Sequence, residues 1–446
     1  MTSSPKRTGA KQTDVRQTCA CAENVRSIIA AGVVACLLLA ASFVKYQSAN
    51  RAIPEAQRFL AVGSSFIASQ PIAPDVRAAE PSADRAADPN ALVTSGPPRM
   101  FHLDPAHSNR SPFRGPATPS LSVLADLRDP IQTAPAILGD GTIVVATLAG
   151  NVYGIRFDGT RAFTTNMNER VYASPLVVGN QVFFGSDHGR FVRISSTGGI
   201  GWSLSTDGDA DTSATPAPNK SIVFAADNTL YCTRTDGTVM WRVRAKRKIY
   251  SSPAVDSDGT VFVGAQDHRL YGVSSTGTVR FATNLGHDID CAPSIGERGS
   301  VYVGTDGGTI AAIDKKSGSV VWQKPVGGHV RGGLTLTRSH DVVAGLYGPS
   351  PRVVCLHGAT GELLWSFSVP GTGAKEHGVH GSPVEDKDGN LYFGSQDNAV
   401  YSLTARGELR WKVGTGGDID APVVLVSDGV LLAASDDGKL YRVVEP

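Results

Sequence analysis

The sequence predicts an all-β fold, an eight-bladed β-propeller of about 40-residue four-stranded blades, preceded by a single transmembrane helix and a disordered linker. Three observations lead to this fold. A unit of about 40 residues recurs eight times, each unit alternates apolar and polar residues around tight turns, and all five tryptophans occupy the same place in the unit. Because 42 Lys+Arg balance 41 Asp+Glu and 41% of the residues are hydrophobic, the composition argues against an electrostatic nucleic-acid binder and against wholesale disorder.

The N-terminal part contains one long apolar stretch, residues 27–44, which carries no charged side chain. A helix of this length just spans a hydrocarbon core about 30 Å thick. Five Lys and Arg against two acidic residues in 1–26 predict that this tail stays in the cytoplasm. We therefore expect a signal anchor in the bacterial inner membrane with the propeller in the periplasm. A cleaved signal peptide and a lipidated Cys36 remain alternatives.

Residues 45–119 are rich in Ala, Pro, Ser, Asp and Arg, and they hold 11 of the 26 prolines. No helical or alternating period continues through them. This composition is typical of an extended, disordered tether.

The repeats occupy residues 120–446 and are anchored by a small residue followed by proline. The last unit has room for only three strands before the chain ends, and a closed ring needs four so that no sheet edge stays open. We expect residues 121–127 to supply the missing strand, which puts Val123 in the aromatic column of that blade. The anchors are Pro135, Pro175, Pro216, Pro253, Pro293, Gly333, Pro383 and Pro422.

One large aromatic residue ends seven of the units. A single aromatic per blade on the last strand is typical of packing between neighbouring sheets, so we interpret these residues as core and not as a ligand cage. They are Phe163, Trp202, Trp241, Phe281, Trp322, Trp365 and Trp411.

Polar residues precede the anchors, and in a propeller this segment enters the innermost strand and lines the mouth of the central channel. The interval before Pro383 is about ten residues longer than the others and adds two histidines to the same mouth. A solvated polar rim and a partner-binding surface explain this pattern equally well. The candidate residues are Arg170, Asp211, Lys248, Asp288, Asp290, His329, Arg331, His377, His380 and Asp420.

The repeat resembles the pyrroloquinoline-quinone (PQQ) repeat over about three quarters of the chain. Ser252-Pro253, Gly264–Asp267, Leu270-Tyr271 and Gly407–Trp411 carry the resemblance. The family includes quinoprotein dehydrogenases and non-catalytic propellers. Among the latter is the propeller lipoprotein of the bacterial outer-membrane β-barrel assembly machinery, to which this chain is similar in blade number and length.

The family's quinoproteins carry an adjacent cysteine pair, a metal site beside the quinone and in some members a Cys-x-x-Cys-His segment, and this sequence has none of the three. We therefore expect no catalytic residues, no metal and no cofactor. The expected function is a membrane-tethered, monomeric scaffold that binds an envelope protein or an extended peptide and no nucleic acid. A quinone- or carbohydrate-binding redox or sensor propeller is the alternative.

Overall fold

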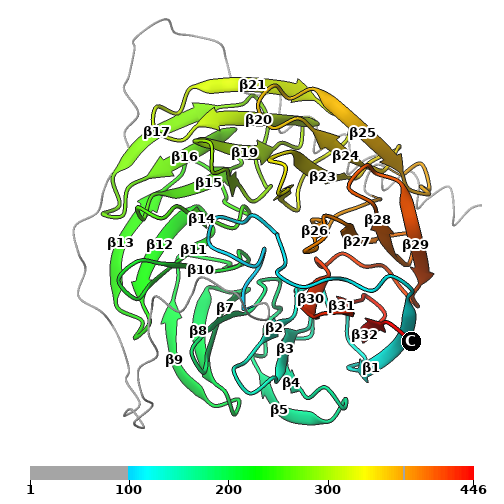
Figure 1. Ribbon diagram of the computed structural model, residues 1–446. Coiled ribbons are helices and arrows are strands. Elements are labelled where there is room, and N and C mark those ends of the chain that lie inside the picture. The colour runs from blue at the N-terminus through cyan, green and yellow to red at the C-terminus, as the bar shows by residue number, and fades with distance from the viewer. Residues whose placement is uncertain (1–98, 375–376) are drawn as a thin grey trace, which may run out of the picture. The chain divides into compact units, whose positions relative to one another are not determined.

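The structure, a computed structural model, describes residues 99–374 and 377–446. Its eight four-stranded antiparallel sheets surround a central axis (Figure 1), so the predicted eight-bladed propeller is confirmed. No helix in these two ranges is long and apolar enough to span a membrane. The expected tail, the span 27–44 and most of the expected linker lie outside the described residues.

In each of the first seven blades the strands follow in sequence order from the axis outward (Figure 1). Blades one to four consist of β2 (Ala136–Ile137), β3 (Ile143–Ala146), β4 (Asn151–Ile155) and β5 (Arg161–Asn166); β6 (Leu176–Val178), β7 (Gln181–Ser186), β8 (Arg190–Ser195) and β9 (Ile200–Ser205); β10 (Thr215–Ala217), β11 (Ser221–Ala226), β12 (Thr229–Arg234) and β13 (Val239–Arg244); and β14 (Ala254–Val255), β15 (Val261–Ala265), β16 (Arg269–Val273) and β17 (Val279–Asn284).

The remaining blades have the same order, except that the first strand of the chain is the outer strand of blade eight. They consist of β18 (Ser294–Ile295), β19 (Ser300–Gly304), β20 (Thr309–Asp314) and β21 (Val320–Pro325); β22 (Leu334–Leu336), β23 (Val342–Leu346), β24 (Arg352–Leu356) and β25 (Leu363–Ser368); β26 (Val384–Glu385), β27 (Leu391–Ser395), β28 (Ala399–Leu403) and β29 (Leu409–Gly414); and β30 (Val424–Ser427), β31 (Val430–Ala434), β32 (Lys439–Val444) and β1 (Ser120–Asp126).

Burial follows position in the blade. The second strands are buried along their whole length, as in β15, or along all but the first residue, as in β7, because neighbouring blades cover both faces, and they are accordingly rich in Val, Ile, Phe and Ala. The outer strands alternate, as in β5, where Phe163 and Thr165 are buried and their neighbours are not. The hydrophobic core therefore lies between the blades, in seven clusters around the ring.

The expected closing strand is confirmed, because β1 pairs with β32 and completes blade eight. The predicted position of Val123 is wrong. Val123 lies opposite Tyr441 with half of its surface exposed, and Ser122 occupies the place opposite Arg442 that the aromatic residue takes in other blades. A β-bulge at Leu124 shifts the register, and the Leu124 carbonyl lies where the ring would pack.

The seven outer-strand aromatics each reach the next segment of the ring. A glycine in the turn before the following outer strand leaves room for the ring; a Cβ on Gly361, for example, would lie 2.7 Å from Trp322. The indoles also donate hydrogen bonds across the blade boundary, as from Trp322 Nε1 to the Gly358 carbonyl (3.0 Å). Trp411 donates instead to the carbonyl of Pro116, which precedes β1 (2.9 Å).

Residues 99–119, which we call the strap, lie within the described structure and pack on the propeller, so the disorder expected of 45–119 does not extend to them. In Figure 1 the strap crosses the centre of the ring. Its backbone carbonyls accept hydrogen bonds from Val177, Val255, Ile295 and Leu336 on the inner strands of blades two, four, five and six. These main-chain bonds hold the strap without needing a regular sequence pattern.

The strap side chains fill the channel from this face. His102, His107 and Asn109 are buried, and His102 Nε2 lies 2.7 Å from Ser382 Oγ. His107 contacts the Pro293 carbonyl and Thr215 Oγ1 on different blades. Burial lowers the pKa of both histidines, to about 4 for His107.

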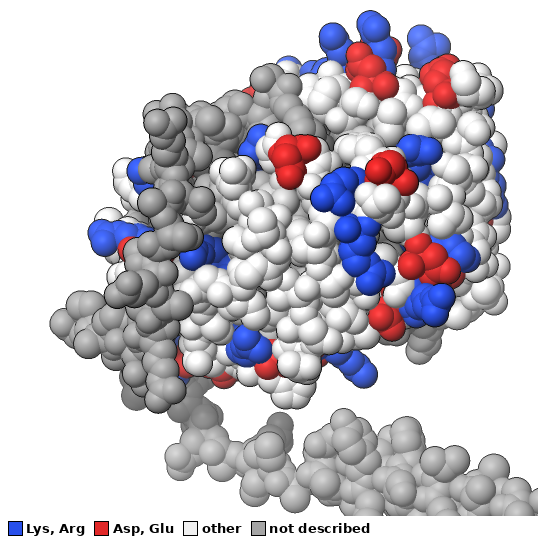
Figure 2. Space-filling model, turned by 90° about the horizontal axis from the view of Figure 1, so that it is seen from below, with Lys and Arg blue, Asp and Glu red and all other residues white. Residues whose placement is uncertain are grey.

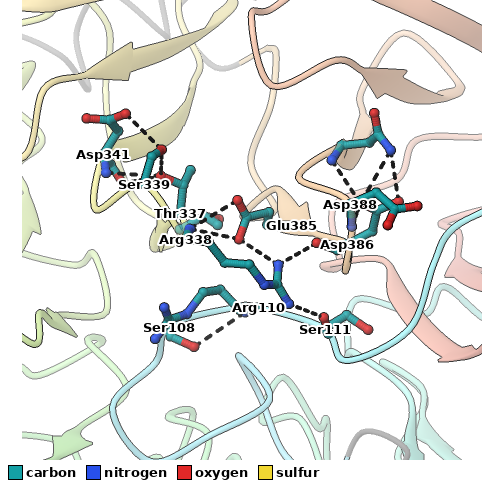
Figure 3. Close-up of polar contacts among 12 residues, drawn as sticks. Ser108, Arg110, Ser111, Thr337, Arg338, Ser339, Asp341, Glu385, Asp386 and Asp388 are labelled. Atoms are coloured by element: carbon teal, nitrogen blue, oxygen red, sulfur yellow. Dashed lines mark hydrogen bonds and ion pairs between the residues drawn. The ribbon is translucent and has the colours of Figure 1, made fainter.

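One ion pair clamps the strap to blades six and seven. The Arg338 guanidinium donates to the Glu385 carboxylate (2.8 Å) and to the Ser111 carbonyl of the strap (2.6 Å), as Figure 3 shows. The backbone N–H of Arg338 also donates to Glu385, whose side chain is almost completely buried. The charge on Glu385 is thereby compensated and coupled to the position of the strap.

Candidate partner-binding site at the channel mouth

The channel mouth is the end opposite the strap. The strap bonds to residues at the carboxyl ends of inner strands, whereas the mouth consists of the residues that lead into those strands. Two features mark one equivalent mouth position in every blade. A buried aliphatic residue comes directly before that position. The carbonyl of the residue before the aliphatic one accepts a hydrogen bond from a backbone N–H in the turn between the two middle strands. Eight equivalent positions follow: Gln132, Tyr172, Asp211, Tyr250, Asp290, Arg331, His380 and Asp420.

Four other candidates belong to a second set of equivalent positions, two residues earlier. Arg170, Lys248, Asp288 and His329 occupy this outer ring, together with Asp209 and Asp418. Asp211 lies five residues before Pro216, just as Arg170 lies five before Pro175, so the prolines predict that both belong to one set; the structure places Asp211 in the inner set instead. The backbone N–H of Ser174 donates to Ser213 Oγ, and that of Ser213 donates to Ser252 Oγ, so Ala214 and not Pro216 is the equivalent of Pro175.

Cations cover only part of the acidic surface at the mouth. Lys248 lies 3.5 Å from Asp209 and 3.8 Å from Asp227. Arg331 pairs with Asp306 at 2.8 Å. In blade eight, Asp418, Asp420 and Asp436 form no ion pair with any described residue, and the nearest donor is Gln132 Nε2, 2.9 Å from Asp436.

Burial raises the pKa of several mouth carboxyls. The pKa of Asp290 rises to about 6, with the charge of Asp306 as a further cause, and that of Asp436 also rises to about 6. The pKa of Asp211 is raised by burial and by the adjacent Asp187. One buried oxygen each of Asp211, Asp290, Asp420 and Asp436 has no hydrogen-bond partner among the described residues. Because these oxygens are buried and accept no hydrogen bond from the described residues, ionisation of Asp211, Asp290 and Asp436 is disfavoured.

A second cluster at the mouth is basic and aromatic. The Tyr347 ring lies between those of His329 (5.1 Å between centroids) and His380 (5.8 Å), and the Arg331 guanidinium is 5.2 Å from the same ring. The remaining candidate, His377, does not join them, because its Nε2 lies 2.9 Å from the Gln396 carbonyl. Residues 347–351 and 377–380, both within the long interval before Pro383, meet here, since Gly348 N donates to the His377 carbonyl.

The flank of the ring drawn in Figure 2 carries interspersed Lys/Arg and Asp/Glu side chains. The described side chains visible there form no extended field of one sign, which a partner of strong opposite charge would require. In residues 99–374 and 377–446, no group of three or more His, Cys, Asp and Glu side chains is placed to hold a metal ion.

The sequence matches the family described as outer membrane protein assembly factor BamB over residues 120–233, 226–347 and 349–444. The chain belongs to this family of PQQ-like propellers. No curated protein sequence matches it.

Solved structures show the same fold at low sequence identity. BamB from Moraxella catarrhalis is 19% identical with a TM-score of 0.60, covering 73% of this chain and 100% of that one. Quinohemoprotein alcohol dehydrogenase from Comamonas testosteroni is 12% identical with a TM-score of 0.66, covering 80% and 82%. A europium-containing methanol dehydrogenase is 9% identical with a TM-score of 0.63, covering 78% and 90%. PQQ-like propellers thus include both enzymes and an assembly factor.

Proposed function

We propose that this protein is a non-catalytic propeller, tethered to the inner membrane by residues 27–44, that binds an envelope protein or an extended peptide at the channel mouth. The observation that carries the proposal is the set of four mouth carboxylates with buried, unpartnered oxygens beside a basic and aromatic cluster, in which Tyr347 is buried and the His329, Arg331 and His380 side chains are partly exposed. Unsatisfied buried acceptors cost free energy in the unbound protein, and a partner whose donors reach these carboxyls once the side chains turn toward it recovers that free energy. Membership of the BamB family supports a role in outer-membrane or envelope assembly.

The proposal is tested by chemical cross-linking and pull-down from native membranes with the full-length protein. One variant carries Lys248→Ala, Asp288→Ala and His380→Ala at the mouth. A matched control carries Lys316→Ala, Arg406→Ala and Glu408→Ala at exposed turns on the strap side. We expect an envelope partner that the wild type and the control capture and the mouth variant loses. Capture by all three proteins would exclude the mouth as the binding site, and capture by none would exclude the scaffold function.

Quinone or carbohydrate binding is the alternative, because quinohemoprotein dehydrogenases share the fold. It predicts a visible absorbance change or a higher melting temperature when PQQ and calcium, or a sugar, are added to the purified protein. Neither change is expected of the scaffold.

A further inference from the structure

The boundary between blades five and six contains a groove of about 550 Å³. Its lining includes Lys324 and Val326 from blade five and Arg352, Val354, Leu356, Glu362 and Leu363 from blade six, so two cations and one carboxylate face it. The groove is separate from the channel mouth. Leu363 and Lys324 are exposed at its opening, whereas Val354 and Leu356 form its buried floor.

Blade six lacks, on the wall of this groove, a tyrosine that five of the other seven blades have. At the position of Val354, on the third strand and facing the preceding blade, five other blades carry Tyr153, Tyr231, Tyr271, Tyr401 and Tyr441. In blade seven the row across the three outer strands is Phe393, Tyr401 and Lys412. The same row in blade six is Ala344, Val354 and Ser366.

The filled blades show how an aromatic ring is held at this position. Lys412 Nζ lies 4.9 Å from the centre of the Tyr401 ring, and Arg242 lies 5.0 Å from that of Tyr231. In blades four, seven and eight the tyrosine hydroxyl donates to the aspartate four residues earlier. The fold thus provides an apolar slot with a cation over the ring.

In blade six Ser366 stands where blades three and seven have the cation over the ring, but two other cations, Lys324 and Arg352, line the groove. Lys324 and Arg352 form no ion pair with a described residue, and the Arg352 guanidinium donates only to the backbone carbonyls of Ser350 and Val326. An aromatic side chain next to a carboxylate complements both features, since the ring covers the apolar floor and the carboxylate meets the cations.

We propose that this groove binds a tyrosine or phenylalanine side chain, flanked by acidic residues, of an extended segment of a partner protein. The segment replaces from outside the ring that the chain itself supplies in five other blades. This binding surface lies beyond the proposed mouth site and does not depend on it.

The test is a fluorine NMR titration of the full-length protein with the peptide Ac-Gly-Glu-Tyr-Glu-Gly-amide, in which the tyrosine carries a ring fluorine. Competition against it uses the unlabelled peptide and versions with Ala for Tyr or Lys for Glu. Saturable binding of the Tyr peptide is expected. The affinity of the Ala peptide should be at least about tenfold lower, because it lacks the ring that is buried in the groove. No saturable binding, or equal binding of the Tyr and Ala peptides, would overturn the proposal.

Two variants locate the binding. The double substitution Val354→Tyr with Ser366→Lys rebuilds in blade six the Tyr–Lys pair of blade seven. It is expected to lower the affinity for the Tyr peptide at least about tenfold and to leave the melting temperature unchanged. If that variant does not fold, Lys324→Glu at the exposed opening is used instead. The Lys324→Glu protein is expected to bind the Lys-flanked peptide more tightly than the Glu-flanked one. Unchanged affinity in the folded variants would overturn the proposal. The triple mouth variant is the control and should bind the peptide like the wild type.

The source of the occupant is settled by placing a photo-cross-linking amino acid at Leu363 in cells. A cross-link to a different protein, mapped to an aromatic residue beside acidic ones, supports the proposal. A cross-link to residues 1–98 of the same chain or to a second copy would overturn it.

Discussion

The indole of Trp322 illustrates how single residues hold neighbouring blades together. It is buried, fills the space above Gly361 and donates to the Gly358 carbonyl of the next blade. We expect Trp322→Ala to lower the free energy of unfolding by about 3–5 kcal/mol, because the substitution leaves a cavity and an unpaired carbonyl. The measurement is urea denaturation followed by circular dichroism. Val321→Ala, at the exposed neighbouring position, is the control, and equal midpoints for the two variants would contradict the packing role.

A second prediction at this scale concerns Asp290, whose pKa is raised by burial to about 6, above the model-peptide value near 4. Between these two values the folded state binds more protons than the unfolded state, so this residue makes stability fall as the pH rises from about 4 to about 6. We expect Asp290→Asn to flatten that slope, to match the wild type at pH 4 and to be more stable at pH 7. Thermal unfolding over this pH range is the measurement. A variant less stable than the wild type at pH 7 would show that the ionised carboxylate is favourable in the fold.

At the scale of elements, the strap depends on a clamp that local sequence does not reveal. Removing Arg338 leaves the buried Glu385 carboxylate without its cation and frees the Ser111 carbonyl. Because Arg338 is itself partly exposed, we expect Arg338→Ala to cost roughly 1–3 kcal/mol. Hydrogen exchange should show faster exchange at the strap-bonded amides of Val177 and Leu336 than in Arg406→Ala, a variant of an exposed turn. Equal exchange in the two variants would exclude the clamp.

The blades and the strap differ in how far the sequence predicts them. Each blade repeats a pattern of alternating strands, so the repeat length, the aromatic column and the closing strand can be read from residues close in sequence. The strap is held by main-chain bonds to blades 70 or more residues away, and its Pro- and Ser-containing sequence has no period. The prolines were also an imperfect guide to equivalent positions in different blades. Pro216 lies two residues beyond the equivalent of Pro175, so counting back from Pro216 assigns Asp211 to the outer set of mouth residues. Aligning the buried aliphatic residue before each mouth position would have found Tyr172 and Tyr250 as well.

At the scale of the whole molecule, the two ends of the channel have different roles. The strap fills one end with the chain's own residues, and the eight mouth positions line the other. The repeat makes all blades alike in backbone, so differences in recognition arise only where a blade departs from the repeat. The unpaired aspartates of blade eight and the small-residue row of blade six are two such departures.

Ring closure gives the last prediction. β1 joins the N-terminal part of the chain to β32, and without it the backbone groups of β32 form an open sheet edge beside the cores of blades one and eight. We expect deletion of residues 99–126 from the full-length chain to lower the melting temperature and to cause self-association. Deletion of residues 99–119 alone keeps β1 and should leave the protein monomeric. Light scattering after size-exclusion chromatography distinguishes the two, and a synthetic peptide of residues 120–126 should restore the monomer by pairing with β32. A monomeric 99–126 deletion with an unchanged melting temperature would show that the ring is closed by blade packing and not by this strand.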